Sequence, residues 1–94
     1  MQIKTSVILC TYNEEKIIKK TIDNLLNFNH DIEIIVVDDS STDNTVKIIQ
    51  ELNQKEVKLI QRKSRGLASA CLTGLLYSNG ENICWIDSNL PDLA

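Results

Sequence analysis

The stretch Ile34-Ile-Val-Val-Asp-Asp-Ser-Ser-Thr-Asp-Asn-Thr45 decides the expected fold. Its β-branched residues in succession predict a strand that is buried on both faces and is too short for a typical helix. The run ends at Asp38-Asp39, and a cluster of Ser, Thr, Asp and Asn follows before a helical pattern resumes at Val46. Such residues are favoured at helix N-termini. The chain is therefore expected to pass here from a buried strand, through a polar turn, into a helix.

The same alternation of strand and helix patterns runs along the whole chain. We expect strands at residues 4–10, 32–37, 57–60 and 82–86. The first helix should bury Ile18, Ile22, Leu25 and Leu26, and the second should bury Val46, Ile49 and Leu52. Residues 61–66 are expected to form a basic loop. The third helix, residues 67–78, is apolar on nearly all sides and should pack deeply, with Gly80 as its left-handed stop.

Uninterrupted alternation of strands and helices predicts an α/β fold with parallel strands joined by right-handed crossovers. The expected architecture is a three-layer, Rossmann-like sheet of order 3-2-1-4 with helices on both faces. In such a sheet, ligands bind beyond the carboxyl ends of the strands, at the point where the order reverses. The expected crevice lies between the first and fourth strands. It would gather the polar side chains Tyr12, Glu14, Asp38, Asp39, Asp87 and Asn89.

Composition bounds the classes of function. Ninety-four residues are expected to make one small domain. Ten basic and thirteen acidic residues give a net charge of −3, without the basic footprint of a nucleic-acid-binding protein. Cys10, Cys71 and Cys84 lack metal-ligand spacing and are expected to be free thiols of a cytosolic protein. The sequence shows neither the long apolar run of a membrane span nor the pattern of a signal peptide.

The polar stretches after the first two strands each have two interpretations. Tyr12 and Glu14 suit an aromatic platform and a polar contact for a flat ring, whereas Asn13 or Thr11 suits a helix cap. Asp38 and Asp39 are either solvated turn residues or acceptors for a ligand, and Asp39 could accept from a base N–H, which would select a pyrimidine with an imide proton. A calcium loop is not expected, because Asn44 and Gln50 replace its glycine and glutamate. A phosphate-accepting receiver domain would usually need an acidic pair after the first strand.

The later stretches are similarly ambiguous when each is taken alone. Arg62, Lys63 and Arg65 precede Gly66 and a helix start, which suits either a diphosphate site or a solvated loop. The glycine-rich patterns of dinucleotide-binding folds and of ordinary ATP hydrolases are missing. Asp87 and Asn89 offer oxygen ligands for Mg²⁺ or Mn²⁺, or form an Asx-turn ahead of a proline.

Taken together, four stretches resemble the nucleotide-sugar half of a family 2 glycosyltransferase with the GT-A fold. They are Ser6-Val-Ile-Leu-Cys-Thr-Tyr-Asn-Glu14, Val36-Val-Asp-Asp-Ser-Ser-Thr-Asp-Asn-Thr45, Arg65-Gly-Leu-Ala-Ser-Ala70 and Ile86-Asp-Ser-Asn-Leu90. The third is most similar to the polyprenyl-phosphate sugar synthases, of the dolichol-phosphate mannose synthase type. In order and spacing the four stretches cover nearly all of the chain.

This resemblance implies a role for each matching position. A UDP- or GDP-sugar would be bound by Cys10, Tyr12, Glu14, Asp38, Asp39 and Arg65. Asp39 would read the base, and Arg65 would approach the diphosphate. Asp87 and Asn89 stand at the Asp-x-Asp metal motif, with Asp87 as the catalytic position and Mg²⁺ or Mn²⁺ as the cofactor. Cys10 replaces a usual proline, and Asn89 replaces an aspartate, keeping an oxygen but losing a charge.

The resemblance also implies an activity and its setting. Residues 1–94 would be the nucleotide-sugar-binding part of an inverting transferase domain, truncated after the metal motif. The acceptor would be a polyprenyl phosphate in cell-envelope glycan synthesis, and a second chain could supply the acceptor half. The protein would be cytoplasmic or peripheral at the inner face of the membrane. The alternatives are a non-catalytic nucleotide-sugar-binding or regulatory domain and an inactive remnant.

Overall fold

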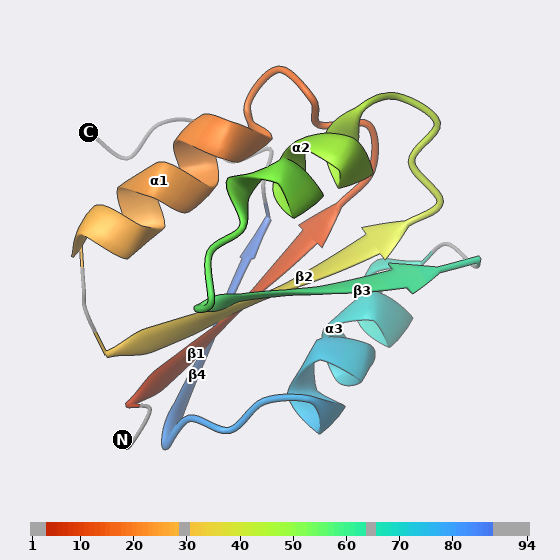
Figure 1. The fold of residues 1–94 in the computed structure, drawn as a ribbon. Helices are drawn as coiled ribbons and strands as arrows, with labels where there is room; N and C mark the ends of the chain where they lie inside the picture. The colour runs from red at the N-terminus through yellow and green to blue at the C-terminus, as the bar shows by residue number, and fades with distance from the viewer. Residues whose placement is uncertain (1–3, 29–30, 64–65, 88–94) are drawn as a thin grey trace.

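The computed structural model describes residues 4–28, 31–63 and 66–87, which form a parallel α/β sheet with helices on both faces (Figure 1). The strand order is β3-β2-β1-β4, as predicted. The elements are β1 (Thr5–Thr11), α1 (Ile18–Phe28), β2 (Ile32–Asp39), α2 (Thr45–Leu52), β3 (Val57–Arg62), α3 (Leu67–Leu76) and β4 (Asn82–Asp87). Strand β3 includes Gln61 and Arg62, which the sequence placed in a loop. Both residues pair with the polar end of β2, opposite Asp38 and Asp39.

Helices α1 and α2 cover one face of the sheet, and α3 covers the other (Figure 1). The first face holds the larger core, built on residues that are at most 7% exposed: Val7, Leu9, Ile18, Ile22, Ile32, Ile34, Val36 and Ile49. The second core contains Ile8, Ile35, Val37 and Ala70. Every residue of β2 is buried, so the prediction of a strand covered on both faces is confirmed.

Helix α3 packs through its small residues Ala70 and Gly74, and not through Leu72, Leu75 or Leu76. Ala70 is 1% exposed and Gly74 is buried against Ile8, whereas Leu72 and Leu76 are 58% and 78% exposed. The prediction that this helix packs deeply on all sides is therefore wrong. Small residues such as Ala70 and Gly74 let a helix approach the sheet closely, while its residues on the outer side stay exposed.

Gly80 does not act as a left-handed stop, because Gly66 is the only described glycine with a positive φ angle. The reason for a glycine at position 80 is close packing. A Cβ atom there would lie 2.6 Å from the backbone nitrogen of Ser6, and the Gly80 N–H donates to the Ser6 hydroxyl at 2.7 Å. The α3–β4 connection is thus held against the start of β1.

A buried carboxylate ties the amino ends of the strands together. Glu33 is 2% exposed and accepts hydrogen bonds from the Ser6 hydroxyl and the Asn79 N–H, both at 2.6 Å. Its other oxygen pairs with Lys58 Nζ at 2.9 Å. Burial by itself raises the pKa of Glu33, but these donors together outweigh it and lower the pKa below its ordinary value. The network lies at the edge opposite the predicted crevice, and sequence analysis did not identify it.

Candidate functional site

The strand register brings the polar strand ends together at the carboxyl edge of the sheet. Because β1 lies between β2 and β4, Thr11 is paired with Asp38, and Cys10 is paired with Asp87. On the far side of β2, Asp39 is paired with Arg62. The predicted meeting of the first, second and fourth strands is therefore confirmed, and the end of β3 joins them.

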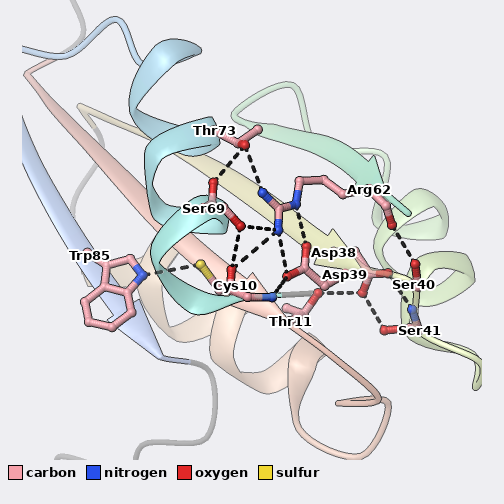
Figure 2. A network of polar contacts seen from close by, with 11 residues as sticks. Cys10, Thr11, Asp38, Asp39, Ser40, Ser41, Arg62, Ser69, Thr73 and Trp85 are labelled. Carbon is pink, nitrogen blue, oxygen red and sulfur yellow. Dashed lines mark hydrogen bonds and ion pairs between the residues drawn. The ribbon is translucent and has the colours of Figure 1, made fainter. Parts of the chain in front are cut away.

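Asp38 is buried and accepts hydrogen bonds from the loop that follows it. Its carboxylate accepts from the Thr11 hydroxyl at 2.6 Å, from the Ser41 hydroxyl at 2.5 Å and from the Ser41 N–H at 3.0 Å (Figure 2). The residue is 1% exposed. These contacts join the end of β1 to the β2–α2 turn, so Asp38 shapes the loops on which neighbouring side chains stand.

Asp39 faces the other side of the sheet and forms a bidentate ion pair. Arg62 donates from Nε to Oδ1 at 2.7 Å and from Nη2 to Oδ2 at 3.1 Å (Figure 2). Each of the two side chains is 11% exposed. Planar paired contacts of this kind are stronger and more directional than single hydrogen bonds. The carboxylate that was predicted to read a base is therefore held in a fixed orientation.

The β1–α1 loop is held to the β2–α2 loop by hydrogen bonds centred on Asn13, a set of contacts called the clasp below. Asn13 Oδ1 accepts from the backbone N–H groups of Thr42 at 2.7 Å and Asp43 at 3.2 Å, and the Asn13 N–H donates to Ser41 Oγ at 2.9 Å. Asn13 adopts a left-handed backbone with φ 53°, which Asn tolerates better than most residues. Its side chain thus binds the neighbouring loop instead of capping α1, and Thr11 likewise binds Asp38.

The clasp continues into the start of both helices. The Glu14 N–H donates to Thr45 Oγ1 at 2.8 Å, and the Glu15 N–H donates to Asp43 Oδ2 at 3.3 Å. Burial raises the pKa of Asp43, but the Thr45 hydroxyl and backbone N–H groups outweigh it, so the pKa is lowered. A hollow of about 290 Å³ lies beside this clasp and is lined by Asn13, Glu14, Glu15, Lys16, Ile17 and Asp43.

The predicted nucleoside contacts lie around this same edge. Tyr12 is half-buried, and Glu14 is 8% exposed. Cys10 is half-buried, and the indole N–H of Trp85 points at its sulfur at 3.3 Å (Figure 2). Strand β4 thus places the only tryptophan of the chain next to the predicted site.

Two predicted residues, Arg65 and Asn89, lie outside the described residues. Asp87 ends β4 beside Cys10 in the register, so its backbone lies at the predicted edge. Within residues 4–28, 31–63 and 66–87, no group of three or more His, Cys, Asp or Glu side chains gathers to hold a metal ion. The donors that the sequence offers, a carboxylate and an amide oxygen, are of the type that Mg²⁺ and Mn²⁺ accept.

The use of Arg62 was not predicted from the sequence. Arg62 was expected to be a solvated or diphosphate-binding cation, but its guanidinium group also donates to Ser69 Oγ at 2.9 Å and Thr73 Oγ1 at 3.1 Å. The available signal was the spacing of these two hydroxyl residues. Positions i and i+4 of a helix share one face, so Ser69 and Thr73 present a polar stripe on an otherwise apolar helix.

This arrangement defines a Rossmann-like α/β domain whose polar site lies at the carboxyl edge of its strands. Residues 6–90 match the model of glycosyl transferase family 2. The chain therefore belongs to this family.

Curated relatives and solved structures agree with that assignment. The chain is 39% identical to a UDP-N-acetylglucosamine–dolichyl-phosphate N-acetylglucosaminyltransferase of Methanococcus voltae, over 82% of this chain and 37% of the relative. It is 41% identical to the dolichol-phosphate mannosyltransferase of Pyrococcus furiosus, over 94% of this chain and 26% of the relative. The chain thus spans only about a quarter to somewhat more than a third of these relatives.

The fold is shared with glycosyltransferases of known structure. A mannosyltransferase from Pyrobaculum calidifontis, in complex with GDP-Man and Mn²⁺, superposes with a TM-score of 0.85 at 27% identity, over 100% of this chain and 30% of that one. Glucosyl-3-phosphoglycerate synthase from Mycobacterium tuberculosis, in complex with Mn²⁺, UDP and glucosyl-3-phosphoglycerate, superposes with a TM-score of 0.76 at 27% identity, over 95% of this chain and 34% of that one. The predicted family and fold are confirmed. None of the described helices is long and apolar enough to cross a membrane.

Proposed function

We propose that this chain supplies the donor-binding part of a family 2 glycosyltransferase that binds a UDP- or GDP-sugar together with a divalent metal ion. The observation that carries the proposal is the strand order, with β1 between β2 and β4. This order brings the polar ends of three strands to one edge of the sheet, where Thr11 is paired with Asp38 and Cys10 is paired with Asp87. Ligands bind at such an edge in open α/β sheets.

The nucleoside would occupy the edge between the β1–α1 loop and the end of β2. Tyr12 would stack on the base, with Cys10 and Glu14 lining the pocket. Asp39 would accept a hydrogen bond from a base N–H. Asp38 would support this pocket indirectly, because its carboxylate already holds Thr11 and Ser41. The clasp through Asn13 stiffens the loop that carries Tyr12, and such preorganisation lowers the entropy cost of binding.

The diphosphate and the metal ion would lie toward α3 and the end of β4. Arg65, just ahead of the α3 N-terminus, would approach the diphosphate. Asp87 and Asn89 would hold Mg²⁺ or Mn²⁺, and the two related structures that contain Mn²⁺ support this choice of cofactor. When bound, the ion would offset the charge that grows on the departing nucleoside diphosphate. Asn89 in place of a second aspartate should reduce the affinity for the ion.

The acceptor would be a polyprenyl phosphate, whose phosphate oxygen would attack the anomeric carbon with inversion as the nucleoside diphosphate departs. The names of two relatives that act on dolichyl or dolichol phosphate support this class. A phosphate acceptor is already anionic, so it needs less help from a general base than a sugar hydroxyl does. The transfer itself would be a property of the whole protein, working in the cytoplasm at the membrane surface. A donor-binding chain without transfer is the second candidate, favoured by Asn89.

Isothermal titration calorimetry with UDP- and GDP-sugars in the presence of Mn²⁺ tests the donor proposal. We expect saturable binding of at least one of the two nucleotides. A sample that unfolds cooperatively but binds neither nucleotide would overturn the proposal. Adding a polyprenyl phosphate and following sugar transfer separates the two candidates, because only the transferase forms a lipid-linked product.

Two aspartate variants separate base recognition from metal binding. Asp39→Asn should weaken nucleotide binding about tenfold with or without Mn²⁺, because one charged acceptor is lost. Asp87→Asn should weaken it only when Mn²⁺ is present. Asp23→Asn is the matched control, because Asp23 lies on α1 in an exposed pair with Lys19 and should change neither measurement. Equal effects of Asp39→Asn and Asp87→Asn under both conditions would contradict the assigned roles.

A further inference from the structure

The guanidinium group of Arg62 joins three elements at one point. Beyond the pair with Asp39 at the end of β2, it donates to Ser69 and Thr73 on α3 and to the Gly66 carbonyl oxygen at 3.4 Å (Figure 2). Arg62 itself ends β3. Its side chain is 11% exposed, and its contacts with Asp39 and Thr73 are part-buried, whereas Ser69 and Gly66 are exposed residues. A planar group anchored on several sides has little freedom to rotate away from Asp39.

Asp39 is also held by backbone. The Gly66 N–H donates to Asp39 Oδ2 at 3.3 Å. Gly66 has φ 149°, which a residue with a Cβ rarely adopts, and its added Cβ would lie 3.2 Å from Ser69 Oγ. The glycine therefore lets the start of α3 approach the carboxylate closely.

A count of lone pairs shows what this arrangement leaves for a ligand. An ionised carboxylate offers about four acceptor positions. Among the described residues, hydrogen bonds to Asp39 come from Arg62 Nε, Arg62 Nη2 and the Gly66 N–H. About one position remains, which matches a single ring N–H such as that of uracil or guanine. Cytosine and adenine carry no proton at the corresponding ring nitrogen.

We propose that Arg62 is a positioning residue for base recognition, which fixes Asp39 so that its remaining acceptor position selects bases with a ring N–H. The proposal rests on the proposed function, because it assumes that a nucleotide binds at this edge. It assigns Arg62 to specificity and not to the diphosphate. Both partners of the pair would then discriminate UDP from CDP, or GDP from ADP, although only Asp39 touches the base.

The test measures affinity ratios in the 94-residue chain at saturating Mn²⁺. Calorimetry gives the dissociation constants for UDP against CDP and for GDP against ADP, and within each pair the diphosphate and metal contributions cancel. We expect wild type to prefer UDP or GDP by at least about tenfold, as for one lost hydrogen bond at a buried acceptor. Arg62→Lys keeps the charge but loses the two-point contact. The Arg62→Lys variant should therefore bind UDP and CDP, or GDP and ADP, with affinities that differ by no more than about twofold.

Lys63→Gln is the matched control, because Lys63 is an exposed neighbour and its loss changes the net charge without touching Asp39. The control should keep the wild-type ratio. Should Arg62→Lys fail to fold, the double variant Ser69→Ala/Thr73→Val carries the test, since it frees Arg62 from α3 while leaving the ion pair. In this double variant the preference for UDP over CDP, or for GDP over ADP, should fall about threefold.

The outcomes distinguish failure of the proposed function from failure of the role assigned to Arg62. Wild type that binds no nucleotide overturns the proposed function and this inference with it. Wild type that binds UDP and CDP equally, and GDP and ADP equally, overturns this inference and the base-reading role of Asp39, but leaves the proposed donor binding standing. An unchanged ratio in a folded Arg62→Lys, or in the double variant where Arg62→Lys does not fold, also overturns it.

Discussion

The two faces of the sheet differ in how completely they are covered. Helices α1 and α2 bury the aliphatic residues on one face, whereas α3 on the other leaves Leu72, Leu75 and Leu76 exposed by 45% to 78%. Ile83 and Trp85 of β4 are exposed by 46% and 42%. The first face holds the larger apolar core, and the second combines a small apolar core with the Arg62 network.

The neighbouring aspartates Asp38 and Asp39 show what this difference means for the site. Successive residues of a strand point to opposite faces. Asp38 therefore meets Thr11 and Ser41 on the side of α1 and α2, whereas Asp39 meets Arg62 and Gly66 on the side of α3. The well-covered face uses its carboxylate to join loops, and the less covered face presents its carboxylate at the proposed nucleotide site.

The largest expected effect tests how completely the helices cover each face of the sheet. Leu9 is fully buried on the α1–α2 face, so Leu9→Ala should lower the free energy of unfolding by about 3 kcal/mol, from lost burial and a residual cavity. Leu76, which is 78% exposed on α3, is the matched control, and Leu76→Ala should change stability by no more than about 0.5 kcal/mol. Urea unfolding measures both. A Leu76→Ala cost similar to that of Leu9→Ala would contradict the difference between the faces.

A second prediction concerns the small contact stripe of α3. Gly→Ala in an exposed helix gains up to about 1 kcal/mol. At Gly74, however, the added methyl group would overlap the buried Ile8 side chain. We expect Gly74→Ala to be destabilising by about 1–2 kcal/mol, because overpacking outweighs helix propensity.

The double variant Ile8→Ala/Gly74→Ala checks the cause of that loss. Removing most of the Ile8 side chain makes room for the methyl group, so the double variant should be more stable than the sum of the two single changes predicts. Additive losses in urea unfolding would show that Gly74→Ala acts through something other than contact with Ile8.

Much of this architecture was predictable from the sequence because apolar spacing carries it. The β-branched run ending at Asp38 predicted a central buried strand, and alternation with helices predicted parallel topology. The order of the strands then brought Cys10, Asp38 and Asp87 to one edge, as expected. These features depend on local patterns and general rules of chain connection, which one sequence already contains.

Features that depend on partners distant in the sequence were missed. The Arg62–Asp39 pair joins residues 23 positions apart, and the Glu33–Asn79 contact spans 46 positions. In the sequence, Arg62 looks like part of an exposed basic loop, and Glu33 looks like an ordinary polar residue at a strand start. The depth of α3 was misjudged for a related reason. Its composition is apolar on nearly all sides, but a single helix can bury only the side that faces the sheet.

The third prediction concerns Glu33, which lies at the opposite edge of the sheet and contacts Ser6, Lys58 and Asn79. Its pKa is lowered in the folded state, so the unfolded chain binds a proton more readily. The contribution of Glu33 is therefore complete above its ordinary pKa of 4.5 and is lost as the pH falls through the lowered folded-state value. We expect Glu33→Gln to cost about 1–2 kcal/mol at pH 7, as for hydrogen bonds to a charged group. Below pH 4 the cost should shrink.

Urea unfolding of wild type and Glu33→Gln between pH 3 and pH 7 makes this measurement. Lys58 is 45% exposed, so most of the effect should come from the Ser6 and Asn79 donors and not from the ion pair. Lys58→Met is the informative control and should cost less than Glu33→Gln at pH 7. A difference between wild type and Glu33→Gln that stays constant with pH would contradict the role assigned to the carboxylate.

The smallest expected effect comes from the clasp at Asn13, which ties the loop of the proposed base contact to the well-covered face. Asn13→Gly removes the bonds from Thr42 and Asp43 but tolerates φ 53°, so it should cost about 1 kcal/mol. Asn13→Ala removes the same bonds and also strains the left-handed backbone, so it should cost roughly 0.5–1 kcal/mol more. Urea unfolding of the two variants separates the clasp from the backbone. Equal stabilities would mean that the Asn13 side chain, and not its left-handed conformation, accounts for the whole contribution of this residue.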